Sequence, residues 1–389
     1  MKILIIGSGM YVTGRGGTGV GTVLAAICQH SINNKIEKVV VVSKSSSSKK
    51  AVLDAFSRIN TVLNSEIDYE FRSVKGSFEE IKSLQDEFGF TAAIVAIPDH
   101  LHFNYIEILI RLGIHNLVVK PLVPTLKEHL ELISLSREYQ VYCAVEFHKR
   151  FDETNLLIKR ELNNGNLGNI KYFQVDYSQR LSIPSEVFKN WSSKSNIFQY
   201  LGVHYVDLID FLTGCEPIRV MAAGVKGTLS SQGIDTWDSV HAMIEWQGSM
   251  ASTKQNFISV HNTSWVDPEC STALSDQVYQ VVGGLGRISC DQKNRGLEYT
   301  RTDEGFSHPN PYFSDFLPGP SGQLQFSGYG YDSIKLFLLD VRDINNGEVT
   351  IEDIHYQRPS FVNTLASTQV VEAVNKSLNG ESQWIEVKK

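Results

Sequence analysis

The sequence predicts an α/β protein with two domains, in which a parallel sheet with helices precedes a second domain rich in strands. The chain has 389 residues, more than one compact core usually organises. Continuous apolar runs alternate with helical patterns in the first part, as they do where helices connect parallel strands. The later part carries strand-like runs separated by short turns. We therefore expect one domain over residues 1–148 and a second over residues 149–389.

Composition and charge narrow the class of protein. Hydrophobic residues make up 42% of the chain and charged residues 20%, which is typical of a soluble globular protein. The formal net charge of -7 argues against a nucleic-acid partner. No apolar run is long enough to span a bilayer, and the first residues are too short for a signal peptide. The five cysteines lack metal-ligand spacing, so we expect reduced thiols, a cytoplasmic location and no metal site.

A glycine-rich turn follows the first predicted strand. Lys2 to Ile6 form an apolar run, and Gly7-Ser8-Gly9 then allow a tight turn and close approach of the backbone to a phosphate. The strict dinucleotide fingerprint would place glycine or alanine at position 12, where this chain has valine, and we expect the next helix to begin near Thr18 or Gly19. A flexible surface loop is the alternative. The candidate cofactor contacts here are Gly7, Gly9, Met10, Tyr11, Val12 and Arg15.

The end of the second predicted strand bears on which nicotinamide cofactor would bind. Val39 to Val42 are apolar and β-branched, and Ser43 and Lys44 open a run of serines and lysines. Enzymes that use NAD usually place a carboxylate here to hold the ribose 2′-hydroxyl. Hydroxyl and ammonium groups suit a 2′-phosphate instead, which predicts a preference for NADP(H), with NAD(H) as the second possibility. A solvated Ser/Lys loop without a ligand is the alternative.

Three later strand-like runs complete the first sheet, and their ends carry further candidates. The runs are Thr91 to Ile97, Leu117 to Val119 and Gln140 to Val145. Ligands in parallel sheets bind at the carboxyl ends of strands, so Ile97, Pro98, His102 and Lys120 are candidate cofactor contacts. His100 and His102 are two residues apart and point in different directions on a helix, which argues against a metal site. Lys120 could otherwise be a surface lysine at a strand end.

The second half reads as strands followed by a closing helix. Gln247-Gly248 is predicted to be a hairpin turn between two strands. The strand-like segments are Ile170 to Gln179, Arg219 to Val225, Ser239 to Trp246, Met250 to Phe257 and Tyr279 to Asp291, and Ser360 to Leu378 has helical periodicity.

His204 lies on a strongly apolar predicted helix. If Phe198 to Leu212 are α-helical, Tyr200, His204 and Asp207 share one face. A histidine suits proton transfer because its ordinary pKa lies near 6.5. The alternative is a histidine satisfied within the core.

Several of these segments, in this order, resemble the Gfo/Idh/MocA family of glucose-fructose oxidoreductases and inositol dehydrogenases. The resemblance implies a Rossmann domain followed by an α/β domain with a large open antiparallel sheet, and a homodimer or homotetramer formed through that sheet. The segments that carry it are Gly7-Ser8-Gly9, Ile97-Pro98-Asp99-His100-Leu101-His102, Val119-Lys120-Pro121-Leu122, Phe147-His148-Lys149-Arg150-Phe151, Gly165-Asn166-Leu167-Gly168-Asn169-Ile170, Gly202-Val203-His204-Tyr205-Val206-Asp207 and Gly286-Arg287-Ile288-Ser289-Cys290-Asp291.

Two positions depart from the family pattern. The family usually has glutamate before the lysine, where this chain has Val119, and aspartate four residues before the histidine, where this chain has Tyr200. The resemblance implies that Lys120 and His204 are catalytic, and Tyr200 could relay a proton in place of the carboxylate. The candidate substrate contacts are Lys120, Arg150, Trp191, His204 and Asp207.

The expected activity is an NAD(P)-dependent dehydrogenase or reductase reaction at a CH–OH group. Hydride would pass between the nicotinamide and a secondary hydroxyl or ketone of a sugar, cyclitol or nucleotide sugar, and the partners would be such a polyhydroxylated small molecule and further copies of the chain. The alternatives are a redox-neutral enzyme with a tightly held cofactor and a non-enzymatic regulator that senses NADP.

Overall fold

The chain divides into two compact units. The computed structural model describes residues 1–14, 20–303 and 305–388. The first unit comprises Met1–Val123, Lys127–Phe151 and Tyr312–Thr364, and the second comprises Pro124–Leu126, Asp152–Pro311 and Leu365–Lys389. Residues 312–364, expected in the second domain, thus pack with the first. Helix α10 (Tyr329–Asn345) explains the difference, because its apolar side chains are buried in the core of the first unit.

A six-stranded parallel sheet forms the centre of the first unit, as predicted. Its strands in spatial order are β3 (Tyr69–Ser73), β2 (Lys38–Ser43), β1 (Lys2–Ile6), β4 (Ala92–Val95), β5 (His115–Val119) and β6 (Cys143–Glu146). Every neighbouring pair is parallel. β1, β2 and β4 are apolar because both faces of the sheet are covered. β3 gave no such signal, since this edge strand is only partly buried and carries charged residues.

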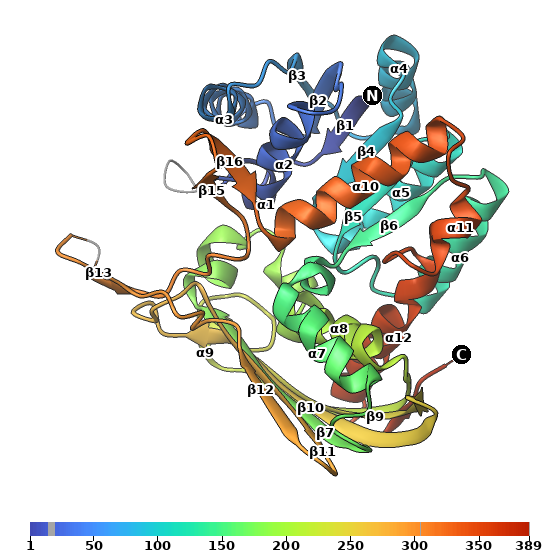
Figure 1. The fold of residues 1–389 in the computed structure, drawn as a ribbon, viewed down its shortest axis with the longest axis vertical. Helices are drawn as coiled ribbons and strands as arrows, with labels where there is room; N and C mark the ends of the chain where they lie inside the picture. Colours follow the sequence, from blue (N-terminus) through green and yellow to red (C-terminus); the bar gives the residue numbers. More distant parts are fainter. Residues whose placement is uncertain (15–19, 304, 389) are drawn as a thin grey trace. The chain divides into compact units, whose positions relative to one another are not determined.

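Helices cover both faces of this sheet (Figure 1). The helices are α1 (Met10–Thr13), α2 (Thr22–Ser31), α3 (Ser48–Leu63), α4 (Phe78–Phe88), α5 (His102–Arg111), α6 (Leu126–Glu138), α10 and α11 (Ile351–His355). Side chains of α2, α3 and α10 share one core with β1 and β2. Two 3-10 turns, η1 (Asp99–Leu101) and η2 (His148–Phe151), follow β4 and β6 at the carboxyl edge of the sheet.

A seven-stranded mixed sheet dominates the second unit. Its strands in spatial order are β12 (Arg287–Asp291), β11 (Ser275–Gly283), β7 (Ile170–Arg180), β10 (Thr253–Asp267), β9 (Ser239–Met250), β8 (Glu216–Val225) and β17 (Ile385–Glu386). Five of its pairings are antiparallel, whereas β7 and β10 run parallel. The expected open antiparallel sheet is therefore a mixed, mostly antiparallel one. Two-stranded hairpins are formed by β13 (Tyr299–Arg301) with β14 (Gly305–Ser307) and, in the first unit, by β15 (Asp315–Pro318) with β16 (Leu324–Ser327).

The hairpin between β9 and β10 turns later than predicted. The strands continue through Gln247 and Gly248, and Met250 pairs with Thr253. The turn residues are Ala251 and Ser252, with φ of 48° and 62°. These positive φ values are those of a tight two-residue hairpin turn. The pairing of the two strands, and not the glycine at position 248, therefore sets where the chain turns.

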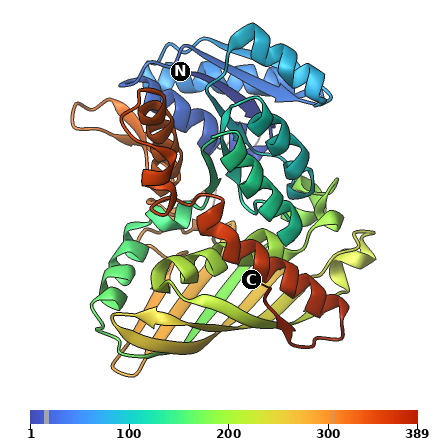
Figure 2. The same cartoon turned by 90° about the vertical axis from the view of Figure 1, so that its right-hand side faces the viewer.

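Helices lie against one face of the second sheet (Figure 2). α12 (Leu365–Asn379) packs on β8 and on α8 (Val203–Thr213), and α7 (Glu153–Asn163) also packs on α8. A short α9 (Thr228–Ser231) follows β8. No helix within the described residues is long and apolar enough to cross a membrane.

Candidate active site

The glycine turn after β1 has the geometry that a phosphate-binding turn requires. Gly7 has φ +112°, and a Cβ there would lie 2.1 Å from the carbonyl oxygen of Ala96. A larger residue would therefore separate β1 from the chain after β4. A Cβ on Gly9 would meet nothing within 4 Å, which leaves open space at the start of α1. Gly7 thus permits the turn, and Gly9 keeps the backbone accessible to a ligand.

Gly21 is a further position beside α1 that accepts only glycine. A Cβ on Gly21 would lie 2.1 Å from the carbonyl oxygen of Val12, so only glycine allows α1 and α2 to approach this closely. Sequence spacing missed this residue because it lies well beyond position 12 in the sequence. α2 begins at Thr22 and not near Thr18 or Gly19. Residues 15–19 lie outside the described residues, and the predicted contact Arg15 is among them.

Met10 and Tyr11 lie in α1, directly after Gly9. Met10 is partly exposed. The hydroxyl of Tyr11 is enclosed within the first unit. Burial and then the negative charge of Glu146 raise the pKa of Tyr11 well above its ordinary value.

The end of β2 presents hydroxyl and ammonium groups, as predicted from the sequence. Ser43 is partly buried and pairs with Ser73 of β3, and the Ser73 hydroxyl donates to the carbonyl oxygen of Lys44 at 3.3 Å. The Lys44 side chain is exposed. α3 begins four residues later, at Ser48, and has no acidic residue in its first turn. A helix start without carboxylates favours a negatively charged ligand.

His102 joins the ends of β4 and β5. One ring nitrogen lies 2.8 Å from the carbonyl oxygen of Ile97, and the other lies 3.0 Å and 2.8 Å from those of Pro121 and Leu122. The ring is 1% exposed, and burial lowers its pKa. His102 therefore ties the backbone after β4 to the two residues that follow Lys120. Pro98, also a candidate, precedes η1.

Lys120 is a buried lysine at the carboxyl end of β5. Its exposed fraction is 8%, and the Lys120–Pro121 peptide bond is cis. Burial lowers the pKa of Lys120 to about 7, although the negative charges of Glu146 and Asp99 oppose this effect. Lys149 lowers the pKa further by repulsion. A lysine whose pKa lies near neutrality can donate or exchange a proton at physiological pH.

Glu146 ends β6 and was not singled out from the sequence. It is 1% exposed, and one carboxylate oxygen lies 3.0 Å from a ring nitrogen of His148. The His148 ring packs between Phe313 and Tyr329, with ring centroids 5.1 Å and 5.6 Å away. Sequence reasoning missed Glu146 because it is the single polar residue of a short apolar strand.

Arg150 lies in η2 and is also buried. Its exposed fraction is 6%, and its guanidinium donates to the carbonyl oxygen of Asn363 at 3.1 Å. This bond ties η2 to the segment before α12 within the first unit. The contact supports a structural role for Arg150.

Three of the remaining candidates, all in the second unit, lie on two kinds of helix. Phe198–Gly202 form a π-helical turn, and α8 begins at Val203, so Tyr200, His204 and Asp207 do not lie on one continuous α-helix as expected. A Cβ on Gly202 would lie 2.6 Å from the Phe198 ring, which explains the glycine within this tightly packed turn. His204 and Asp207 are 3% and 1% exposed.

Tyr200 and Trp191 belong to an aromatic cluster. Trp191 lies 5.9 Å from Tyr200 and 4.5 Å from Phe188, and Trp265 lies 5.9 Å from Tyr200, between ring centroids. Tyr200 and Trp191 are partly exposed. The His204 ring has Tyr177 as an aromatic neighbour at 6.2 Å.

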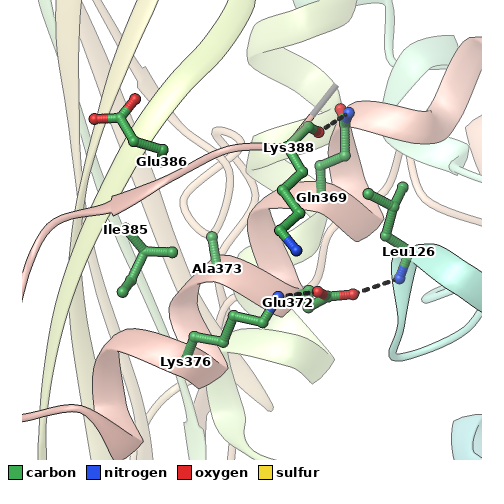
Figure 3. A pocket seen from close by; sticks show the side chains of 8 residues that line it. All are labelled: Leu126, Gln369, Glu372, Ala373, Lys376, Ile385, Glu386 and Lys388. Carbon is green, nitrogen blue, oxygen red and sulfur yellow. Dashed lines mark hydrogen bonds and ion pairs between the residues drawn. The ribbon is translucent and has the colours of Figure 1, made fainter.

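A separate hollow lies on the second unit between α12 and β17 (Figure 3). Glu372 accepts a hydrogen bond from the Leu126 backbone at 2.6 Å and pairs with Lys376. None of its lining residues is a predicted site residue. Across the described ranges, no group of three or more His, Cys, Asp or Glu side chains is arranged to hold a metal ion.

Known proteins match the chain in both units. Residues 1–147 match the family model described as "Oxidoreductase family, NAD-binding Rossmann fold", and residues 156–289 match that described as "GFO/IDH/MocA C-terminal domain". An inositol 2-dehydrogenase of Rhizobium meliloti (strain 1021) is 22% identical over 260 residues, which cover 67% of this chain and 72% of the relative. The scyllo-inositol 2-dehydrogenase (NADP(+)) of Bacillus subtilis (strain 168) is 25% identical over 201 residues, which cover 50% of this chain and 54% of the relative.

Solved structures agree on the fold. The myo-inositol 2-dehydrogenase from Lactobacillus plantarum superposes with a TM-score of 0.68 at 15% identity, over 100% of this chain and 99% of the other. The first family match covers the glycine turn and the parallel sheet, and the second covers most of the mixed sheet. Because the two matches occur in order and together span more than half of the residues, the chain belongs to the Gfo/Idh/MocA family of NAD-binding oxidoreductases.

Proposed function

We propose that this protein transfers hydride between NADP(H) and a secondary hydroxyl or ketone of a sugar, cyclitol or nucleotide sugar. The observation that carries the proposal is Lys120, a buried lysine with a pKa of about 7 at the carboxyl end of a strand in a nucleotide-binding sheet. Such a sheet binds its ligands at that edge. The relatives named as inositol dehydrogenases support a polyhydroxylated substrate.

The cofactor would supply the hydride acceptor or donor. Gly7 and Gly9 fit a dinucleotide because a Cβ on Gly7 would be blocked and the space beside Gly9 is open. Met10, Tyr11 and Val12 follow in α1, and Ile97, Pro98 and His102 come from the end of β4 and the segment after it. These residues would bind and orient the nucleotide. Arg15 remains a candidate from the sequence alone.

Side chains of the protein would transfer the proton and stabilise the reacting oxygen. Lys120 would donate a hydrogen bond to the reacting oxygen and stabilise negative charge as it develops there. His204 would take the hydroxyl proton during oxidation and return it during reduction. Tyr200 would relay that proton, because its hydroxyl occupies the chain position where the family has a carboxylate.

Substrate contacts would come from Trp191 and Asp207, in addition to the two catalytic side chains, whereas Arg150 would hold η2 in place through its bond to Asn363. Trp191 is partly exposed beside Tyr200 and could pack on the apolar face of a sugar ring. Asp207 is buried one turn after His204 and could orient the imidazole.

Cofactor preference can be measured without knowing the substrate. Ser43 and Lys44 offer groups for a 2′-phosphate, and no carboxylate occurs among the residues from Ser43 to Lys50. We expect the Kd for NADPH to be at least about tenfold lower than that for NADH, since charge-assisted bonds to phosphate each contribute about 1.5–3 kcal/mol. Titration by protein-to-nicotinamide energy transfer measures both constants. Tighter binding of NADH would contradict the preference.

The reaction can be tested with a panel of cyclitols, sugars and nucleotide sugars and NADP+ or NAD+, followed by absorbance at the nicotinamide band. Lys120→Ala and His204→Ala should each lower kcat by at least about 10²-fold, as removal of an acid–base or oxyanion-stabilising group does. Both variants should still bind NADPH. Near-normal turnover in either variant would refute the role assigned to that residue.

The assembly proposed from the sequence is a homodimer or homotetramer. In the second sheet, Tyr172 is 39% exposed and pairs in register with Ile258, whose side chain is partly exposed. Association of copies would cover such apolar groups. Light scattering coupled to size exclusion would measure the mass, and a monomer at micromolar concentration would contradict this proposal.

A further inference from the structure

Glu146 is a buried carboxylate that the proposed proton transfer does not use. It ends β6 and is 1% exposed. One oxygen lies 3.0 Å from a ring nitrogen of His148, Oε1 is enclosed, and the Tyr11 hydroxyl also interacts with the carboxylate. An ionised carboxylate is costly to bury unless a positive charge lies nearby. The environment of Glu146 therefore calls for a compensating cation.

Lys120 is in position to be that cation. Val119 and Glu146 are register partners in the parallel pair β5–β6, so Lys120 follows directly from the residue opposite Glu146. Both side chains leave the same carboxyl edge of the first sheet. Among the charged groups acting on Lys120, Glu146 is the strongest that favours the ammonium form.

The other titratable groups around this pair are few, and their charges partly cancel. Asp99 attracts the Lys120 ammonium and Lys149 repels it. By element, the surrounding groups of the first unit are Tyr11 and Tyr329 (α1 and α10), Asp99 (η1), His102 (α5), and His148 and Lys149 (η2). Asp99 and Lys149 have opposite signs and act on Lys120 in opposite directions, so Glu146 supplies the largest attraction for its ammonium group.

We propose that Glu146 is a positioning residue that keeps the ammonium group of Lys120 protonated at the end of β5. This inference rests on the proposed function, in which Lys120 must carry its proton to bind the reacting oxygen. Glu146 acts through Lys120 and makes no contact of its own with the reacting atoms. Without this charge, burial would lower the pKa of Lys120 further, because the largest interaction that raises this pKa would be gone.

The protonation of Lys120 can be followed directly in the protein without substrate. Protein carrying 13C-labelled lysine reports each ammonium through the chemical shift of its ε-carbon as pH is varied. The Lys120 signal is assigned by its absence in Lys120→Met. We expect a wild-type midpoint near the value of about 7.

Three variants separate charge from packing. Glu146→Gln keeps the size and hydrogen-bonding capacity of the side chain but removes its charge, and it should lower the Lys120 midpoint by at least about one pH unit, a tenfold change in proton affinity. Glu146→Asp keeps the charge and should stay closer to wild type. Glu107→Gln removes an exposed carboxylate of α5 that pairs with Arg111, and it should leave the midpoint unchanged. Circular dichroism verifies that each variant is folded.

The proposal is overturned if Glu146→Gln leaves the midpoint within about 0.3 pH unit of wild type, or if Glu146→Asp lowers it equally. Where turnover is measurable, the alkaline limb of the kcat/KM profile should move to lower pH in Glu146→Gln. A midpoint that moves in the NMR titration while this limb stays fixed would support the role of Glu146 and refute that of Lys120 in the reaction.

Discussion

Replacement of Lys120 by methionine should stabilise the protein at neutral pH, although it should abolish turnover. The lysine has a pKa of 10.5 in an unfolded chain and about 7 in the folded protein. At about 1.4 kcal/mol per pKa unit, this difference corresponds to a cost of about 5 kcal/mol at pH values below 7. Methionine has a similar length and no charge. It avoids this cost but leaves Glu146 without its neighbour, so we expect a net gain of about 1–2 kcal/mol at pH 6.5.

The pH dependence gives a sharper test than the absolute stability. Between pH 7 and 10.5 the unfolded chain keeps the Lys120 proton while the folded protein has lost it. The free energy of unfolding of the wild type therefore rises with pH across this window, by up to about 1.4 kcal/mol per unit. The Lys120→Met variant lacks this contribution. The stability of the wild type relative to the variant should therefore rise by about 2 kcal/mol between pH 8.0 and 9.5, so that the wild type becomes the more stable protein.

Guanidinium denaturation can assign the effect to the first unit. All five tryptophans, at positions 191, 237, 246, 265 and 384, lie in the second unit. A change in far-UV circular dichroism without a matching change in tryptophan fluorescence therefore reports the first unit. Lys82→Met replaces a half-exposed lysine of α4 and serves as the control, with no comparable trend. Stabilities of wild type and Lys120→Met that stay parallel from pH 8.0 to 9.5 would refute the reasoning.

Three further variants test other parts of the structure. Gly21→Ala should destabilise the first unit by about 1–3 kcal/mol and weaken NADPH binding, because its Cβ would lie 2.1 Å from the Val12 carbonyl oxygen; an unchanged denaturation midpoint would contradict this packing. Ala251→Asn combined with Ser252→Gly should stabilise the second unit by about 1 kcal/mol, because both positions have positive φ; thermal unfolding measures it, and a lower midpoint would argue against the turn. Tyr200→Phe should lower kcat about 10²-fold without unfolding the protein, and unchanged kcat would remove the hydroxyl from the relay.

The sequence predicts the first sheet well because buried parallel strands are continuous apolar runs. β1, β2, β4 and β5 all coincide with predicted runs. β3 was missed because it has one buried residue, Phe71, among partly exposed polar ones. The boundary between the units was only approximate, since α10 returns to the first unit through long-range packing that leaves no local signal.

The candidate site divides in the same way. Gly7 and Gly9 follow from a local motif, whereas Gly21 depends on the close approach of α1 and α2, which are separated in the sequence. Lys120 can be predicted because it directly follows an apolar strand. Glu146 can be recognised only from the register between β5 and β6. Local patterns thus reveal the residues that begin or end an element. They do not reveal residues defined by which elements become neighbours.

The two departures from the family pattern have different structural consequences. At Val119 the carboxylate is missing from β5, but the register partner Glu146 supplies one on β6, so a negative charge still accompanies Lys120. At Tyr200 a hydroxyl within an aromatic cluster stands where a carboxylate is usual, and Phe188, Trp191 and Trp265 surround it with rings. Lys120 thus keeps a carboxylate neighbour. The segment before His204 has an aromatic residue where the family usually has a charged one. If both residues act as proposed, the pH dependence of the reaction is set mainly in the first unit and the choice of substrate mainly in the second.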